Sequence, residues 1–245
     1  MKKQRKMGKL QLLNSFLNQV GFKLEKYNVQ SDFSLRQKQF FNTNQISLIL
    51  DVGANTGIFG KKMKGIGYKN QIVSFEPLST AFSLLEKEAK KHINWTVFNY
   101  ALGNENIKQI INISANSHSS SILDILDAHT DAESSASYIA KEEIEIKTLD
   151  SIATEVGIYN HQEIFLKIDT QGFEMNVLEG AENALEHINT IQLEMSLVPL
   201  YKGQALYNNI FQYLWTKGYR LVDIEEGFVD SHEGKLMQFD GVFRK

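Results

Sequence analysis

The chain has 245 residues, enough for one large α/β domain with a sizeable core. A hydrophobic content of 42% indicates a globular protein, and the absence of cysteine excludes disulfides, thiolate zinc sites and a thiol nucleophile. The net charge is −3, but the first nine residues carry five positive charges and the remaining 236 carry a net −8. Since an acidic body binds a polyanion poorly, we set nucleic acid aside as a partner.

We expect residues 1–44 to form a helical extension and residues 45–245 to form the α/β domain. Residues 10–20 place apolar side chains at helical spacing, but polar residues interrupt them, so neither a signal peptide nor a membrane span is expected. Two interpretations remain: a helix packed on the domain, or a basic amphipathic helix resting on an anionic membrane surface. The expected location is the cytoplasm, with peripheral membrane contact through the basic N-terminus as the second possibility.

After residue 45, short apolar runs alternate with helical stretches. Strands are expected at 46–50, 71–75, 95–99, 164–168 and 190–195, and helices at 58–64, 79–91, 173–185 and 206–217. This order is typical of parallel βαβ units. Two last strands, 219–224 and 236–243, are expected to pair antiparallel at one edge. The sequence therefore predicts a doubly wound, mostly parallel sheet of about seven strands.

The middle of the chain departs from this pattern. Strands are expected at 108–113 and 144–147, and residues 114–143 between them are rich in serine and have no clean period. Such a segment is either a mobile surface loop or a lid over a pocket. It contains His118 and His129, two of six scattered histidines that form no metal-binding spacing.

The strongest local motif is a buried strand that ends in Asp51-Val52-Gly53-Ala54-Asn55-Thr56-Gly57. Ligands of open α/β sheets bind at the carboxyl ends of strands, and Gly53 and Gly57 allow the backbone close to a ligand. The glycine spacing fits neither a dinucleotide fingerprint nor a P-loop. The carboxylate of Asp51 would repel a pyrophosphate and favour a ligand that carries an ammonium and a sulfonium, as S-adenosylmethionine does.

Two further strand ends extend this site. Glu76 follows the second strand 25 residues after Asp51, where a carboxylate can accept both hydroxyl protons of a ribose, although a solvated loop acid is the alternative. Asn99 ends the third strand and can serve as an amide partner for adenine, with Ala101 and Leu102 as apolar walls, or can belong to ordinary strand-end packing.

The fourth and fifth strands end near Asp169 and Glu194. In a parallel sheet these carboxylates lie on the same edge as Asp51 and Glu76, an arrangement that is costly without a function. A general base, a ligand for a substrate hydroxyl and a divalent-metal site all remain open. Glu174, a few residues on, can instead be an acid at a helix start.

The ordered set of motifs resembles the FkbM family of S-adenosylmethionine-dependent methyltransferases over residues 46–245. The pieces are Asp51 to Gly57, Phe75-Glu76-Pro77, Ala101-Leu102-Gly103, Thr148-Leu149-Asp150, Leu166 to Glu174 continuing to Ala181, and Gln238 to Phe243. Residue 171 is Gln where many members carry Glu, which weakens any role for a carboxylate there. The resemblance implies a Rossmann-like fold and methylation of a hydroxyl on a sugar, glycolipid or other natural-product scaffold.

The candidate residues follow from these motifs. Those for cofactor binding are Asp51, Gly53, Asn55, Gly57, Glu76, Pro77, Asn99 and Ala101, and those for catalysis are Asp169 and then Glu194. One alternative adds Mg²⁺ held by Asp169 and Glu194. A nucleotide-dependent oxidoreductase is disfavoured by the glycine spacing, and a non-catalytic glycan-binding or partner-binding module is disfavoured by the intact Asp51 and Glu76.

Overall fold

A computed structural model describes residues 9–116 and 118–245, which divide into two compact units, Met1–Thr43 and Asn44–Lys245. The first unit contains α1 (Lys9–Leu17), the 3-10 helix η1 (Asn18–Val20) and α2 (Phe33–Thr43). The side-chain amide of Asn14 exchanges two 2.7 Å hydrogen bonds with the backbone of Leu24, which ties α1 to the segment after it. Asp32 accepts a 2.9 Å hydrogen bond from the Leu35 backbone N–H and so caps the start of α2.

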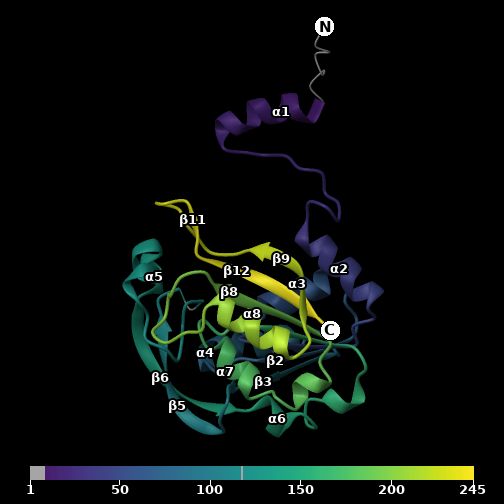
Figure 1. The fold of residues 1–245 in the computed structure, drawn as a ribbon, viewed down its shortest axis with the longest axis vertical. Helices are drawn as coiled ribbons and strands as arrows, with labels where there is room; N and C mark the ends of the chain where they lie inside the picture. Colours follow the sequence, from purple (N-terminus) through teal and green to yellow (C-terminus); the bar gives the residue numbers. More distant parts are fainter. Residues whose placement is uncertain (1–8, 117) are drawn as a thin grey trace. The chain divides into compact units, whose positions relative to one another are not determined.

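The second unit is built on a seven-stranded sheet of order β3-β2-β1-β7-β8-β12-β9 (Figure 1). The strands are β1 (Leu48–Val52), β2 (Gln71–Phe75), β3 (Trp95–Phe98), β7 (Ile164–Ile168), β8 (Thr190–Ser196), β9 (Arg220–Glu226) and β12 (Gln238–Arg244). Only β12 runs antiparallel to its neighbours, and it lies between β8 and β9. The predicted doubly wound, mostly parallel sheet is confirmed, and the last two strands do pair antiparallel.

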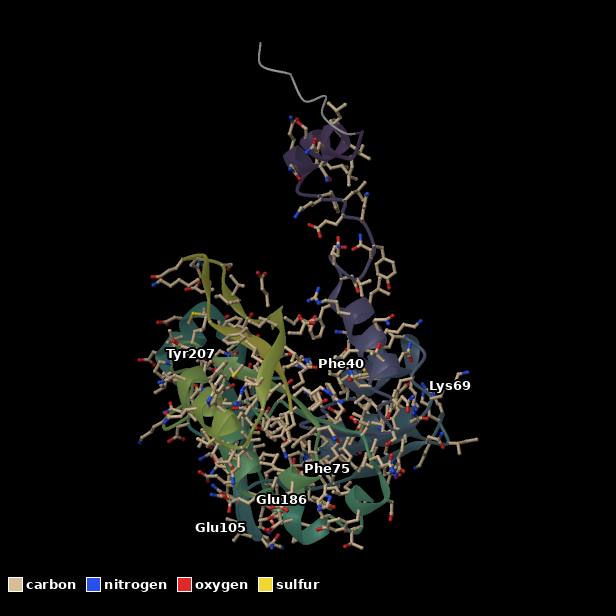
Figure 2. The ribbon with its side chains drawn as sticks, turned by 45° about the vertical axis from the view of Figure 1, so that its right-hand side comes forward. Phe40, Lys69, Phe75, Glu105, Glu186 and Tyr207 are labelled. Atoms are coloured by element: carbon tan, nitrogen blue, oxygen red, sulfur yellow. The ribbon has the colours of Figure 1, made fainter. Side chains whose placement is uncertain are left out.

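Helices cover both faces of this sheet. They are α3 (Ile58–Gly65), α4 (Ser79–Ala89), α6 (Leu149–Ile152), α7 (Glu174–Glu179) and α8 (Tyr207–Thr216), with the 3-10 helices η3 (Ile158–Asn160) and η4 (Ala184–Glu186). Leu48, Leu50 and Val52 pack in one core with residues of α6, α7 and α8. On the opposite face, the Phe59 ring of α3 stacks on Phe165 of β7 at 6.4 Å. Figure 2 shows Phe75 inside this body.

Successive residues of a strand face opposite sides of the sheet, so Asp51 faces away from the core that holds Leu50 and Val52.

A helix was predicted over residues 173–185, but α7 is shorter and spans only Glu174–Glu179. The carboxylate of Asp150 accepts hydrogen bonds from the backbone N–H groups of Asn183 and Ala184, at 3.1 and 2.8 Å, where η4 begins. Asp150, which was singled out only as a family motif, therefore has a structural role.

A smaller three-stranded sheet of order β4-β6-β5 consists of β4 (Ala101–Leu102), β5 (Ile107–Ser114) and β6 (Tyr138–Lys147). A short hairpin pairs β10 (Val229–Asp230) with β11 (Lys235–Leu236). Residues 138–143 of the expected loop extend β6, and the remainder contains α5 (Asp127–Ala132) and the 3-10 helix η2 (Ser134–Ala136). This segment is folded, because Ser121 bridges to Asn112 and the Leu126 backbone N–H donates to the Leu200 carbonyl at 2.9 Å.

Candidate active site

A cavity of about 280 Å³ opens at the carboxyl ends of β1, β2 and β7, with β4 and the segment after β5 on its other walls. This volume is just below the range of roughly 300–1,000 Å³ for small-molecule pockets. Seven of the ten predicted site residues line it: Gly53, Asn55, Glu76, Pro77, Ala101, Asp169 and Glu194. The topology thus brings residues from distant parts of the chain to one site.

Asp51 does not line the cavity, so the expected direct contact with a bound cation is revised. It is fully buried, accepts a hydrogen bond from the Ser74 hydroxyl at 3.1 Å and lies 3.4 Å from the Nζ atom of Lys167. Burial raises the pKa of Asp51, and the ammonium of Lys167 opposes that rise. The charge of Asp51 is therefore matched inside the protein.

Gly57 and Asn99 also lie outside the cavity wall. Gly57 begins α3 with φ at +86°, and a side chain there would press on Leu85 and Trp95. The Asn99 amide donates to the backbone carbonyls of Glu76 and Pro77, at 3.0 and 2.9 Å. Asn99 therefore holds the turn that carries Glu76, and its partnership with a base stays a prediction.

The Glu76 carboxylate is fixed by the backbone around it. One oxygen accepts from the Asn55 backbone N–H at 2.8 Å and the other from the Leu78 backbone N–H at 2.9 Å. Asn55 has φ at +48°, a turn conformation. Burial raises the pKa of Glu76 to about 7. A carboxylate on the wall beside the apolar Leu78, Ala101 and Leu102 fits a nucleoside, which needs an acceptor for its diol and an apolar surface for its base.

Asp169 and Glu194 are joined by one amide. The Gln171 side-chain nitrogen donates to Asp169 at 2.8 Å and to Glu194 at 3.0 Å, while its oxygen accepts from the Tyr201 hydroxyl at 2.9 Å. Gln238 donates a further hydrogen bond to Glu194 at 2.6 Å. The two candidate catalytic residues therefore form a preorganised pair on the cavity wall.

This end of the cavity has an excess of negative charge. Burial and the nearby Asp169 and Asp240 raise the pKa of Glu194 well above its ordinary value. Burial, followed by Asp169, raises the pKa of Asp240 to about 6. In the described residues, no group of three or more His, Asp or Glu side chains is arranged to hold a metal ion.

Glu174 has a structural role beside this site. Its carboxylate accepts hydrogen bonds from the backbone N–H groups of Thr170 and Gly172, at 3.0 and 3.1 Å, and so fixes the turn after Asp169.

Lys167 connects the two ends of the site, and the sequence reasoning missed its role. Its Nζ atom lies 3.4 Å from both Asp51 and Asp169 and donates to the Gly53 carbonyl at 3.3 Å. Although burial alone would lower the pKa of Lys167, Asp169 and Asp51 raise it above its ordinary value, so the side chain is charged. The sequence feature that could have indicated this role is a lysine within the otherwise apolar strand at residues 164–168.

The two histidines of the expected lid lie differently. His118 is exposed and lines the cavity. His129 is buried and does not line it; its ring meets Tyr201 edge-on at 5.2 Å, and burial lowers its pKa. The Ser121 hydroxyl donates to the Gln171 carbonyl at 2.6 Å, so the segment after β5 is anchored to the turn that carries the carboxylate pair.

Strand order and site place the second unit in the class of Rossmann-like α/β folds that methyltransferases use. The sequence model of the methyltransferase FkbM domain matches residues 51–221. The chain therefore belongs to the FkbM methyltransferase family. No curated protein matches it.

Two solved structures match this chain. The methyltransferase FkbM from Methylobacillus flagellatus has 13% identity and a TM-score of 0.53, over 95% of this chain and 58% of that one. This chain thus spans little more than half of that protein. An S-adenosylmethionine-dependent methyltransferase from Mesorhizobium loti has 8% identity and a TM-score of 0.47, over 89% of this chain and 100% of that one.

Proposed function

We propose that the chain is an S-adenosylmethionine-dependent O-methyltransferase whose acceptor is a hydroxyl on a sugar, glycolipid or other natural-product scaffold. The observation that carries this proposal is one cavity with Glu76 on one wall and the Asp169–Glu194 pair on another. Family membership supports methyl transfer, and the carboxylates support a hydroxyl acceptor, because they can accept its hydrogen bond and then its proton.

Each residue has a distinct task in this proposal. Glu76 accepts hydrogen bonds from the ribose hydroxyls, and the turn at Gly53 and Asn55 lies against the nucleoside. When bound, S-adenosylmethionine supplies a methyl group made electrophilic by its sulfonium. Asp169 would accept the proton of the acceptor hydroxyl as the oxygen–methyl bond forms and the sulfur–methyl bond breaks, which leaves S-adenosylhomocysteine; Glu194 is the second candidate for this base. Holding both reactants in one cavity lowers the entropic part of the barrier.

Calorimetric titration with S-adenosylhomocysteine tests the cofactor half. We expect micromolar binding to the native protein and at least tenfold weaker binding to Glu76→Ala, because a hydrogen bond to a charged group contributes about 1.5–3 kcal/mol. Glu105→Ala, at an exposed position of the same unit (Figure 2), should bind as the native protein does. Glu76→Gln retains one acceptor oxygen and guards against a folding defect in Glu76→Ala.

Transfer of labelled methyl groups to sugars and glycolipids tests the second part of the proposal, that the acceptor is a hydroxyl group. Absence of S-adenosylhomocysteine binding would contradict the proposal, and binding of a nicotinamide cofactor in its place would favour an oxidoreductase. Binding without transfer to any hydroxyl acceptor would favour a module that binds glycans or partners without catalysis.

A further inference from the structure

In the described part of the N-terminal segment, residues 1–29, exposed large hydrophobic side chains are far more concentrated than in the rest of the described chain. Nine large hydrophobic side chains between residues 10 and 29 are exposed, among them Phe16 at 65%, Phe22 at 68% and Tyr27 at 74%. The described part of Asn44–Lys245 is about ten times as long as residues 10–29, yet it exposes only twelve such side chains. Scattered exposed hydrophobic residues are ordinary, whereas a concentration of this kind marks an interaction surface.

The described part of the helix in this segment is too short to be stable on its own. The nine residues of α1 fall below the roughly 12–15 residues at which isolated helices become even marginally stable in water. The Asn14–Leu24 hydrogen bonds are polar and bury none of its leucines. An apolar surface that covers Leu13 and Phe16 would supply the missing stabilisation.

The net charge of the segment indicates what kind of surface it binds. The segment carries seven lysines and arginines against a single acid, Glu25, which pairs with Lys23. Its net charge is +6, whereas the remaining residues hold 19 basic and 28 acidic side chains, a net −9. An anionic surface therefore attracts the segment and repels the rest of the chain.

Basic residues beside Leu, Phe and Tyr are typical of helices that lie in a membrane interface. A nucleic acid would satisfy the charges but would leave the aliphatic side chains exposed to water. No helix in residues 9–116 or 118–245 is both long and apolar enough to cross a bilayer, which fits a segment that lies along the surface.

We propose that residues 1–29 dock this protein on an anionic phospholipid surface. The basic residues lie among the headgroups, and side chains such as Phe16 and Phe22 enter the boundary between headgroups and acyl chains. This docking does not depend on the proposed methyl transfer, since none of residues 9–29, the described part of the segment, lines the cavity.

Flotation of the full chain with phosphatidylcholine vesicles, with and without phosphatidylglycerol, tests this proposal. We expect binding to the anionic vesicles, at least tenfold weaker binding to neutral ones, and loss of binding in high salt because salt screens the attraction. Replacing Lys2, Lys3, Arg5 and Lys6 with Gln should weaken binding about a hundredfold or more, since each basic residue near such a surface contributes about fivefold. The matched control replaces Lys69, Lys87, Lys90 and Lys91 with Gln and should bind as the native protein does.

A second pair of variants tests the apolar contribution. Phe16→Ser with Phe22→Ser should weaken binding at least tenfold, whereas Leu84→Ser with Ile93→Ser, at exposed positions of the second unit, should not. Failure of the native chain to float with anionic vesicles would overturn the proposal. Binding to RNA or to a second copy of the chain, detected by sedimentation velocity, in the absence of vesicle binding would overturn it in favour of that partner.

Discussion

The two ends of the cavity both carry carboxylates, but the protein treats their charges differently. At the β1–β2 end, Asp51 is paired with the Lys167 ammonium, and both oxygens of Glu76 accept backbone N–H groups. At the β7–β8 end, Asp169 lies 3.4 Å from the same ammonium, but Glu194 is joined to Asp169 only through the neutral amide of Gln171. The carboxylates of the first end are held by a cation and by backbone N–H groups, whereas the second end retains an excess of negative charge that a proton can relieve. Under the proposed function, this difference separates cofactor recognition from proton transfer within one cavity.

Lys167→Met should have the largest effect, because it leaves Asp51 buried without a cation. We expect a loss of about 3–5 kcal/mol in the free energy of unfolding, measured by urea denaturation. Adding Asp51→Asn should restore part of the loss, whereas Lys69→Met at the surface should change stability by less than about 0.5 kcal/mol. A loss below about 1 kcal/mol for Lys167→Met would mean that the ion pair does not compensate Asp51.

Asp169→Asn is expected to lower turnover at saturating substrate by about 100-fold or more, because it removes the proposed base. Affinity for S-adenosylhomocysteine should change less than about threefold, since Glu76 and its backbone partners remain. Asp131→Asn, at an exposed position of α5, is the matched control. Intact turnover in Asp169→Asn, with a large loss in Glu194→Gln, would transfer the role of base to Glu194.

Cofactor binding should depend on pH through Glu76. Its pKa of about 7 lies above the ordinary value for a carboxyl group, so the ionised form, which can accept hydrogen bonds from both ribose hydroxyls, predominates only above neutrality. Affinity for S-adenosylhomocysteine should therefore rise about tenfold between roughly pH 6 and pH 8, measured by calorimetry. Glu76→Gln should bind more weakly and show no such rise; a rise that persists in this variant would assign the titration to another group.

Gln171→Glu should have the smallest effect. It places a third carboxylate beside Asp169 and Glu194, and like charges raise one another's pKa. The acid limb of the profile of kcat/KM against pH should move up by about one unit, with about fivefold lower activity near neutrality. Gln162→Glu, at an exposed position, should leave the profile unchanged. If the acid limb of the kcat/KM profile does not move in Gln171→Glu, the Asp169–Glu194 pair does not determine that limb.

The sequence predicted the bounds of two buried, mostly apolar strands well. β2 and β7 begin and end at the residues expected, and their buried side chains explain why periodicity and turn signals suffice. The position of Glu76 on the cavity wall could be inferred in the same way, because it follows a parallel strand directly.

Contacts between distant segments could not be inferred. Asp51 was expected to meet a ligand, but its partner, Lys167, lies opposite it in the register of β1 and β7, and strand order must be known before this pairing can be seen. Gln171 was considered a weakness of the site, although its amide joins the two carboxylates. Local patterns report which residues are buried and do not report which side chains face one another.

Gly53 limits how this site can change over evolution. A Cβ atom at this position would lie 1.9 Å from the carbonyl oxygen of Asp169, so the turn after β1 and the turn after β7 touch backbone to backbone. A single added methyl group would therefore displace both turns at once. Under the proposed function, a change in cofactor preference and a change in acceptor preference cannot be selected independently through this position, and residue 53 should tolerate no substitution while the rest of the cavity wall diversifies.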